Sequence, residues 1–352
     1  MWKASNTPNS TDGVGTFSST GEYNAMGNPL SMRSGDNFKG VTTMPNSTYT
    51  FYKLFQGSTK LISAENIALP CTTIRGHCYR NMFYGCSSLT TAPKLVSTAA
   101  LPIYAYCCMF RGCSSLTTVP EFTVSFNTSS SNACDQMFIS CASLVTISFT
   151  TTGSSMPYRG MANMFSSCTS LQSVNTILSP TTITGNSAYT EMFSSCTSLI
   201  SAPRICAITD SSTEASMANM FKSCTSLVNP PIMDGLTTLK KNGCIYMFDG
   251  CSKLESAPYL PAATLNTSSY NYMFRNCSKL KYIKCLATNI SASGCLYNWL
   301  SGVASGGTFV KHPEMASWPR SASGIPSSWT VLEAVDITVT YENGNSGAYI
   351  KE

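Results

Sequence analysis

Cysteine and histidine offer this chain its most reactive side chains, and it has 17 cysteines and two histidines. A catalytic cysteine or serine needs a histidine as its base, and zinc needs cysteine and histidine ligands at a regular spacing. His77 lies next to Cys78 in the sequence, and His312 lies near the C-terminal end. Neither histidine stands in a ligand spacing, so we expect no catalytic residue, no metal and no cofactor.

Paired carboxylates would be a second source of chemistry, because two of them in one cleft can hydrolyse a glycosidic bond. Here the acidic residues are isolated from one another and do not recur at a regular spacing: Glu121, Asp135, Glu191, Asp234, Asp249 and Glu255. We therefore expect a protein that is not an enzyme. A carbohydrate-active enzyme is the alternative from another class, and two carboxylates in one cleft would favour it.

A repeated motif accounts for many of the cysteines. The stretch 82–95, MFYGCSSLTTAPKL, recurs every 26 to 28 residues, with phenylalanines in register from Phe55 to Phe274. Cysteine follows the phenylalanine by three residues in eight of nine copies, and leucine follows it by six in all nine. A repeat of this period indicates a solenoid whose recurrent residues face the core. Typical core residues are Phe83, Cys86, Leu89, Phe110, Cys113, Leu116, Phe193, Cys196, Leu199, Phe248, Cys251 and Leu254.

The eight cysteines of this column are expected to be buried, reduced thiols. In stacked coils their Cβ atoms would lie about 4.8 Å apart, whereas a disulfide prefers about 3.8 Å. The column ends in Ser58 on one side and Val303 on the other, and neither residue can bridge or ligate. Outside the column, Cys107 and Cys108 are adjacent, which leaves a vicinal bridge open.

The repeat predicts an α+β repeat solenoid with leucine-rich-repeat-like coils of about 27 residues. Met-Phe and the two residues after it predict one short helical or 3₁₀ turn, and the segment from the leucine to the proline predicts a short strand. One strand per coil would stack in parallel on the next. We expect β-rich caps at both ends, because the terminal coils need cover.

The predicted organisation has four parts. Residues 1–50 form an N-terminal β cap of short strands or hairpins, and residues 51–300 form nine coils and a degenerate tenth. Residues 301–332 form a C-terminal cap whose indoles cover the last coil, and residues 333–352 form a terminal β-hairpin.

Composition excludes several classes of partner. Charged residues make up 11% of the chain and the net charge is +5, without the clusters of lysine and arginine that follow a phosphate backbone. We therefore expect no nucleic-acid partner. Apolar runs fall short of the roughly 18 residues that cross a membrane, and the first residues do not resemble a secretory signal.

The positions at which the copies differ are candidates for binding. Two residues after each conserved leucine the chain has mostly hydroxyl side chains, and the position three further on has no common chemistry. This variation between copies could be neutral drift at solvent-exposed positions, or it could mark a recognition surface. The candidate residues are Thr91, Lys94, Thr118, Glu121, Thr146, Phe149, Ser173, Ser201, Arg204, Ser256, Tyr259 and Tyr282.

The motif MFxGCxSLxxAPxL, the spacer 260–265 and the ending 299–331 resemble the BspA-like leucine-rich-repeat surface proteins of Bacteroides-type gut bacteria and their phages. The resemblance covers about residues 38–331 and implies a non-enzymatic, adhesin-like surface scaffold. Such a scaffold recognises a host or cell-surface protein through the strand face of the solenoid, on the bacterial cell surface or outside the cell.

The resemblance also allows a second hypothesis, that the protein is a phage appendage. The chain opens at Trp2 as if in mid-domain and without an export signal, which fits a fragment or a phage-encoded version carried on a virion. A phage appendage would bind a cell-surface glycan. An exposed aromatic row at Phe149, Tyr259 and Tyr282, beside the hydroxyl ladder, would favour this glycan hypothesis.

Overall fold

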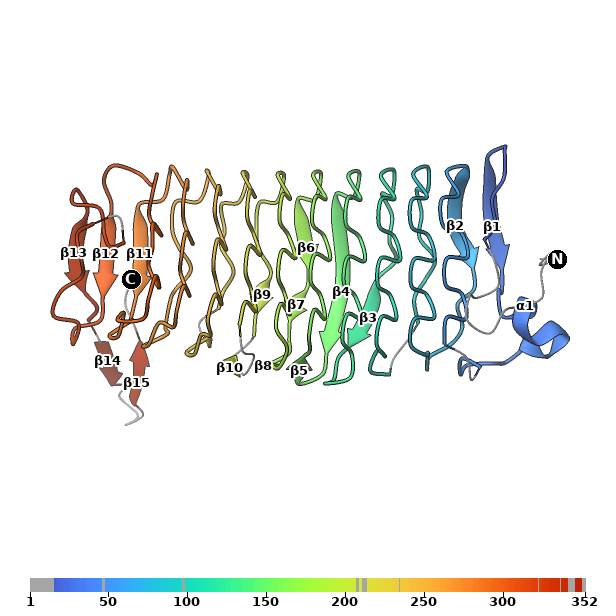
Figure 1. Cartoon of the computed structure of the whole chain (residues 1–352), viewed down its shortest axis with the longest axis horizontal. Helices are drawn as coiled ribbons and strands as arrows, with labels where there is room; N and C mark the ends of the chain where they lie inside the picture. Colours follow the sequence, from blue (N-terminus) through green and yellow to red (C-terminus); the bar gives the residue numbers. More distant parts are fainter. Residues whose placement is uncertain are drawn as a thin grey trace.

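The chain is folded into a long row of stacked coils, seen side by side in Figure 1. The computed structural model describes residues 16–45, 48–96, 99–206, 209–210, 214–233, 235–321, 323–335, 337–340 and 346–349. Strand β1 (Tyr23–Gly27) and helix α1 (Ser31–Ser34) lie at one end of the row, and strands β11 (Tyr282–Cys285), β12 (Thr308–Lys311) and β13 (Thr330–Glu333) lie at the other (Figure 1). Each coil contacts its two neighbours, as expected of a solenoid.

The side of each coil that was expected to be helical is a chain of overlapping β-turns. The N–H of Met82 donates to the carbonyl of Tyr79, three residues back (3.1 Å), and the N–H of Phe83 donates to Met109 in the next coil (2.8 Å). This alternation repeats along the coil. The described helices are one turn of α-helix, α1 (Ser31–Ser34), and the 3₁₀ helix η1 (Gly35–Phe38), both before the first full repeat. The prediction of an α+β solenoid with a helical turn in each coil is therefore wrong.

The spacing of the coils explains this correction. The rings of Phe83 and Phe110, in adjacent coils, have centroids 5.3 Å apart. Packed helices need about 8–10 Å between their axes, and a helix uses its N–H groups internally. A ribbon of β-turns is thin enough for the observed spacing, and it leaves every second N–H free to bond to the neighbouring coil.

The ribbon of turns places one residue in four in the left-handed region. In one coil these residues are His77 (φ 59°), Asn81 (φ 58°) and Gly85 (φ 72°), and the neighbouring coils repeat the pattern. Each occupies the third position of a turn, where a type II turn requires a positive φ. Gly85 is the clearest sequence signal of these positions, and His77 and Asn81 belong to the residue types that, after glycine, adopt a positive φ most often.

Short parallel strands form the other sides of the coils. The strands are β1 (Tyr23–Gly27), β2 (Leu61–Ile67), β3 (Phe122–Ser125), β4 (Thr146–Thr152), β5 (Ser155–Met156), β6 (Ser173–Asn175), β7 (Ile177–Leu178), β8 (Thr182–Ile183), β9 (Arg204–Ile205), β10 (Thr209–Asp210), β11 (Tyr282–Cys285), β12 (Thr308–Lys311), β13 (Thr330–Glu333), β14 (Ile337–Thr340) and β15 (Ser346–Tyr349). Their sheets have two or three strands, and all pairs are parallel except β14–β15.

The described part of the N-terminal segment, for which a cap of short strands or hairpins was predicted, contains one short strand, β1, in register with the solenoid. Strand β1 pairs in parallel with β2, and Phe17 stands in the phenylalanine column, with its N–H donating to Leu54 (2.7 Å). Phe17 precedes Phe55 by 38 residues, and α1 and η1 take up part of this extra length. Residues 1–15 of the expected cap lie outside the described residues, and the four predicted domain boundaries stay predictions.

At the C-terminal end, indole rings cover the last coils. The N–H of Phe274 donates to the carbonyl of Trp299, which thus stands in the methionine column (2.9 Å). Trp299, Trp318 and Trp329 are buried, and the first two stack at 5.9 Å. Strand β12 pairs in parallel with β11 and β13. Strands β14 and β15 pair antiparallel, as in a hairpin, and the residues that join them lie outside the described part.

The cysteine column lies in the core, and each of its eight thiols donates to a backbone carbonyl. All eight cysteines are 0% exposed, and each Sγ lies 3.0 to 3.2 Å from the carbonyl oxygen of the phenylalanine in the preceding coil. Ser58 makes the same contact with Phe17 through its hydroxyl. All 17 cysteines of the chain are free thiols. Burial raises the pKa of the Cys86, Cys168 and Cys224 thiols to about 12.

Candidate functional site

The hydroxyl row of the candidate face is aligned by strand pairing. Thr91 lies opposite Ser63 on one side and Thr118 on the other, all in parallel register. The same register joins Thr146 to Ser173, Ser201 to Asn229 and Ser256 to Tyr282. These side chains are half-buried or exposed. Equal spacing from the leucine in the sequence therefore places them in one ladder across the coils.

The second row of the candidate face is less regular. Lys94, Glu121 and Arg204 are exposed, but Phe149 is only 2% exposed and its ring stacks on Phe122 at 5.4 Å. The expectation that Phe149 lies on the exposed face is wrong. In the sheet it pairs with Phe122 and not with Glu121, because the preceding coil has one more residue between its leucine and this row.

The remaining aromatic residues of the candidate face lie near its C-terminal end. Tyr259 and Tyr282 are half-buried, and the ammonium group of Lys284 lies 5.5 Å from the centroid of the Tyr259 ring. With Phe149 in the core, the predicted aromatic row is reduced to these two tyrosines.

Exposed branched apolar side chains were not anticipated on the strand face. Val145, Ile200 and Val228 each follow a conserved leucine and are 40%, 47% and 45% exposed. Backbone hydrogen bonds through Gln172 connect them into one row (2.8 to 3.1 Å). The sequence signal was available, since the position after the leucine is apolar in these copies.

Two more isoleucines extend this surface on the row of Arg204. Ile177 pairs with Arg204 in the sheet, and the N–H of Ile205 donates to the carbonyl of Ile232 (2.9 Å). Ile177 is 55% exposed and Ile232 is 53% exposed. We call the five residues Val145, Ile177, Ile200, Val228 and Ile232 the apolar strand-face patch.

The turn side carries stacked aromatic rings beside basic groups. The His77 ring stacks between Tyr49 and Tyr104, with centroids 4.4 and 4.7 Å apart, and the Arg80 guanidinium lies 4.7 Å from the Tyr104 ring. Burial, with a smaller contribution from Arg80, lowers the pKa of His77. A similar cluster near the other end joins Tyr246 and Tyr272 with Arg275. The faces of these rings already contact each other.

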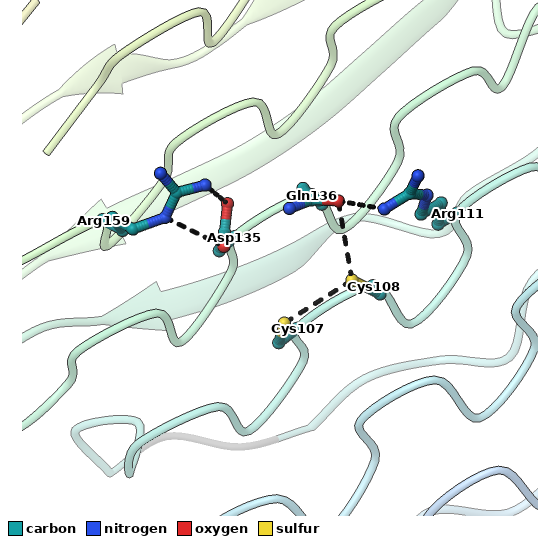
Figure 2. Close-up of polar contacts among 6 residues, drawn as sticks. All are labelled: Cys107, Cys108, Arg111, Asp135, Gln136 and Arg159. Atoms are coloured by element: carbon teal, nitrogen blue, oxygen red, sulfur yellow. Dashed lines mark hydrogen bonds and ion pairs between the residues drawn. The ribbon is translucent and has the colours of Figure 1, made fainter. Parts of the chain in front are cut away.

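A compact polar cluster surrounds the adjacent cysteines on the turn side (Figure 2). The Sγ atoms of Cys107 and Cys108 lie 3.6 Å apart, and Cys108 Sγ lies 3.9 Å from Gln136 Oε1. Arg111 donates to the same amide oxygen from the other side. The adjacent thiols are in contact without a bond.

Next to this cluster, a buried carboxylate is held by two hydrogen bonds from a guanidinium (Figure 2). Arg159 Nε and Nη2 donate to the two oxygens of Asp135, at 3.2 and 3.1 Å. Burial raises the pKa of the Asp135 carboxyl, and the bonds from Arg159 oppose this shift. Asp135 is thus engaged in a structural ion pair.

Other acidic side chains are also engaged with partners. Asp249 pairs with Arg275 at 2.7 Å, Glu255 with Lys281 at 2.9 Å and Glu214 with Lys241 at 3.1 Å. Asp234, named above as a possible carboxylate, lies outside the described residues. Among the side chains that the structure describes, no three of the His, Cys, Asp or Glu type come together in a way that could hold a metal ion.

A cavity of about 360 Å³ opens beside the C-terminal cap. It is lined by Leu300, Ser301, Arg320, Ser321, Gly324, Ile325, Pro326 and Ser327. Its lining therefore contains one cation and no carboxylate. In the described part of the chain, no helix has the length and apolar character to cross a membrane.

Comparison with known proteins identifies the repeat. The model of the family described as a Mycoplasma protein of unknown function, DUF285, matches residues 49–177, 78–204 and 159–286, which together are more than half of the chain. The crystal structure of a leucine-rich cell surface protein from Faecalibacterium prausnitzii is 18% identical, with 81% of this chain and 80% of that chain covered and a TM-score of 0.34. No curated protein matches the chain. The chain therefore belongs to the DUF285 family.

Proposed function

We propose that this repeat protein is a non-enzymatic scaffold, exposed on a cell surface, that binds a protein partner through its strand face. The observation that carries the proposal is the apolar strand-face patch. Five exposed branched side chains lie on four consecutive coils, on both sides of the ladder Thr146, Ser173, Ser201 and Asn229. Exposed apolar side chains gathered on one face and bordered by polar groups are typical of a protein interface.

The polar ladder between the apolar rows fits the same role. Within the ladder the Asn229 amide donates to Ser201 Oγ at 2.8 Å, and two residues further along the strands the Asn175 amide donates to Ser148 Oγ at 3.2 Å. These side chains are therefore oriented before a partner arrives, which reduces the entropy lost on binding. The rigid backbone of stacked coils offers an extended surface for a partner of similar length.

A surface location rests on the resemblance to BspA-like proteins described above. The proposal of a non-catalytic role draws support from the acidic residues, because the carboxylates of Asp135, Asp249 and Glu255 are each paired with a basic group.

A glycan is the second candidate ligand, favoured by Tyr259, Tyr282 and Lys284 near the end of the strand face. The Ser256–Tyr282 bridge brings the two tyrosine-bearing coils together, and Lys284 reaches the Tyr259 ring. Tyrosine rings beside hydroxyl groups could support a sugar ring. Tyr259 lies in the coil next to that of Val228 and Ile232, so the two candidates are told apart by separate substitutions in each group.

The test uses arrays of purified extracellular proteins and of glycans, probed with the purified chain. We expect saturable binding to a protein, lost in the double variant Ile200→Lys/Val228→Lys. The matched control is Ile103→Lys, since Ile103 is also apolar and 42% exposed but lies on the turn side. Binding to glycans alone, lost in Tyr259→Ala, would support the second candidate and overturn the first. Failure to bind on either array would overturn both.

A further inference from the structure

The adjacent thiols of Cys107 and Cys108 are set apart from the other cysteines by their contact with each other. Cys107 is 3% exposed and Cys108 is half-buried, so Cys108 is the more exposed residue of the pair. The cysteines of the core column instead point their Sγ atoms at backbone carbonyls. Packing therefore accounts for the column thiols but not for a second thiol at Cys108.

The surroundings of the pair act on the charge of the Cys108 sulfur in both directions. The Cys108 thiol donates towards Gln136 Oε1, which favours the protonated form, whereas the Arg111 guanidinium at the same oxygen brings a positive charge close to the sulfur. The hydrogen bond from Cys107 lowers the pKa of the Cys108 thiol, and Arg111 acts in the same direction, whereas burial and Asp135 oppose them. The same hydrogen bond raises the pKa of Cys107. The more exposed residue of the pair, Cys108, is thus also the one whose thiol has the lowered pKa.

We propose that Cys107 and Cys108 form a redox-active thiol pair that reacts with hydroperoxides, with Cys108 reacting first and Cys107 resolving the product. The Cys108 thiolate would attack one oxygen of hydrogen peroxide. The O–O bond breaks, an S–O bond forms, and hydroxide leaves, so that sulfur is oxidised to a sulfenic acid and the peroxide is reduced. The Cys107 thiol then attacks the Cys108 sulfur, the S–O bond breaks, and water leaves as the S–S bond forms.

The contact between the two Sγ atoms makes the second step feasible. They lie 3.6 Å apart and need to approach to about 2.05 Å. Adjacent Cα atoms across a trans peptide are about 3.8 Å apart, shorter than the 4.4–6.8 Å of most disulfides. A bond between neighbouring residues would therefore be strained and easily reduced, as in regulatory disulfides.

Oxidation would also disturb the backbone hydrogen bonds to the neighbouring coils. The N–H of Cys108 donates to the carbonyl of Asp135 in the next coil (2.9 Å), and the carbonyl of Cys107 accepts from Asn81 in the preceding coil (3.0 Å). Closing a strained ring at this peptide would displace both groups. The pair is therefore placed to loosen the contacts among three coils when it is oxidised.

Peroxide treatment of the native protein, followed by tryptic mapping, tests the proposal. Cleavage after Lys94 and Arg111 releases residues 95–111, whose only cysteines are Cys107 and Cys108. Cys206 is the matched control, because it is a half-buried thiol without an adjacent cysteine and the peptide 205–222 contains no other. The expected result is that peptide 95–111 loses two hydrogen atoms on peroxide treatment and regains them with dithiothreitol.

Two cysteine variants identify the order of the steps. In Cys107→Ser, dimedone should trap a sulfenic acid at Cys108, at least about tenfold faster than at Cys206. In Cys108→Ser, dimedone should leave Cys107 unlabelled. Equal rates at Cys108 and Cys206 would overturn the proposal. Persistence of the sulfenic acid in the unaltered protein, without loss of two hydrogen atoms, would also overturn it.

Discussion

The rings of Phe83 and Phe110 stack with their centroids 5.3 Å apart and their planes 2° from parallel. The same contact continues from Phe55 to Phe274, with separations of 5.2 to 5.5 Å. The stack has the coil-to-coil spacing that the backbone hydrogen bonds require. Because each coil packs against its neighbours, the loss of one ring should destabilise its own coil and the two beside it.

Removing one ring from the middle of this stack should therefore be costly. Phe138 is 0% exposed and stacks on Phe110 and Phe165. We expect Phe138→Ala to lower the free energy of unfolding by about 3–5 kcal/mol, through lost contacts and the cavity left behind. Urea unfolding monitored by circular dichroism measures this. Val145→Ala, at an exposed position of the same coil, should change the stability by less than about 1 kcal/mol, and equal effects of the two would contradict a role for the stack.

The sequence predicted which side chains form the core of the solenoid better than it predicted the backbone conformation of the coils. The spacing of Phe83, Cys86 and Leu89 was enough to indicate which side chains face inward, because packing between coils demands the same residue type at the same phase. The local sequence of residues 82–85 does not decide between a helical turn and a series of β-turns. The choice depends on the 5.3 Å spacing to the next coil, which is a long-range property.

Register limited what could be predicted about the candidate face. The hydroxyl ladder lies close to the conserved leucine, so counting from Leu61 and Leu89 correctly pairs Ser63 with Thr91. Further from the leucine, one additional residue before Phe122 shifts the pairing and sends Phe149 into the core. The N-terminal coil was missed for a related reason, since Phe17, Thr20 and Tyr23 keep the spacing of the motif but not its methionine, cysteine and leucine.

The cysteine column should make the protein sensitive to alkaline pH. Burial raises the pKa of Cys86, Cys168 and Cys224 from 9.0 to about 12. Above about pH 9 the unfolded chain loses these protons while the folded chain keeps them, so stability is fully present below pH 9 and is lost as the pH rises towards 12. Each thiol contributes a slope of about 1.4 kcal/mol per pH unit in this range.

Cys168→Ala isolates one of these contributions. Its free energy of unfolding should fall less steeply between about pH 9 and about pH 10.5, by about 1.4 kcal/mol per pH unit. Urea titrations at several pH values measure the slope. Cys206→Ala serves as the control, because Cys206 lies outside the buried column. An unchanged slope in Cys168→Ala would show that this thiol is not protected in the folded state.

Residues other than glycine at positive φ should be open to stabilisation. Glu191 has φ 56°, and its N–H and carbonyl bond to Ala218 and Ser194, contacts that glycine would keep. A left-handed conformation costs most residues roughly 1–2 kcal/mol, of which glycine recovers part and loses some to entropy. We expect Glu191→Gly to raise the free energy of unfolding by up to about 1 kcal/mol. Lys222→Gly, in the next coil and without a positive φ, should lower it by a similar amount, and a loss of stability in both variants would contradict the argument.

Buried and exposed ion pairs should differ in their contribution to stability. Asp249 is 4% exposed and accepts hydrogen bonds from Arg275 Nε and Nη2 at 2.9 and 2.7 Å. Arg275→Ala would leave this carboxylate buried without its cation, so we expect a loss of at least about 2 kcal/mol. Adding Asp249→Asn should restore part of it, since the amide carries no charge. Lys241→Ala breaks the exposed pair with Glu214 and should cost less than about 1 kcal/mol. Denaturant unfolding of the unaltered protein, the two single variants and the double variant tests the comparison. A double variant less stable than Arg275→Ala would show that the lost stability comes from the packing of Arg275 on Tyr246 and Tyr272 and not from its charge.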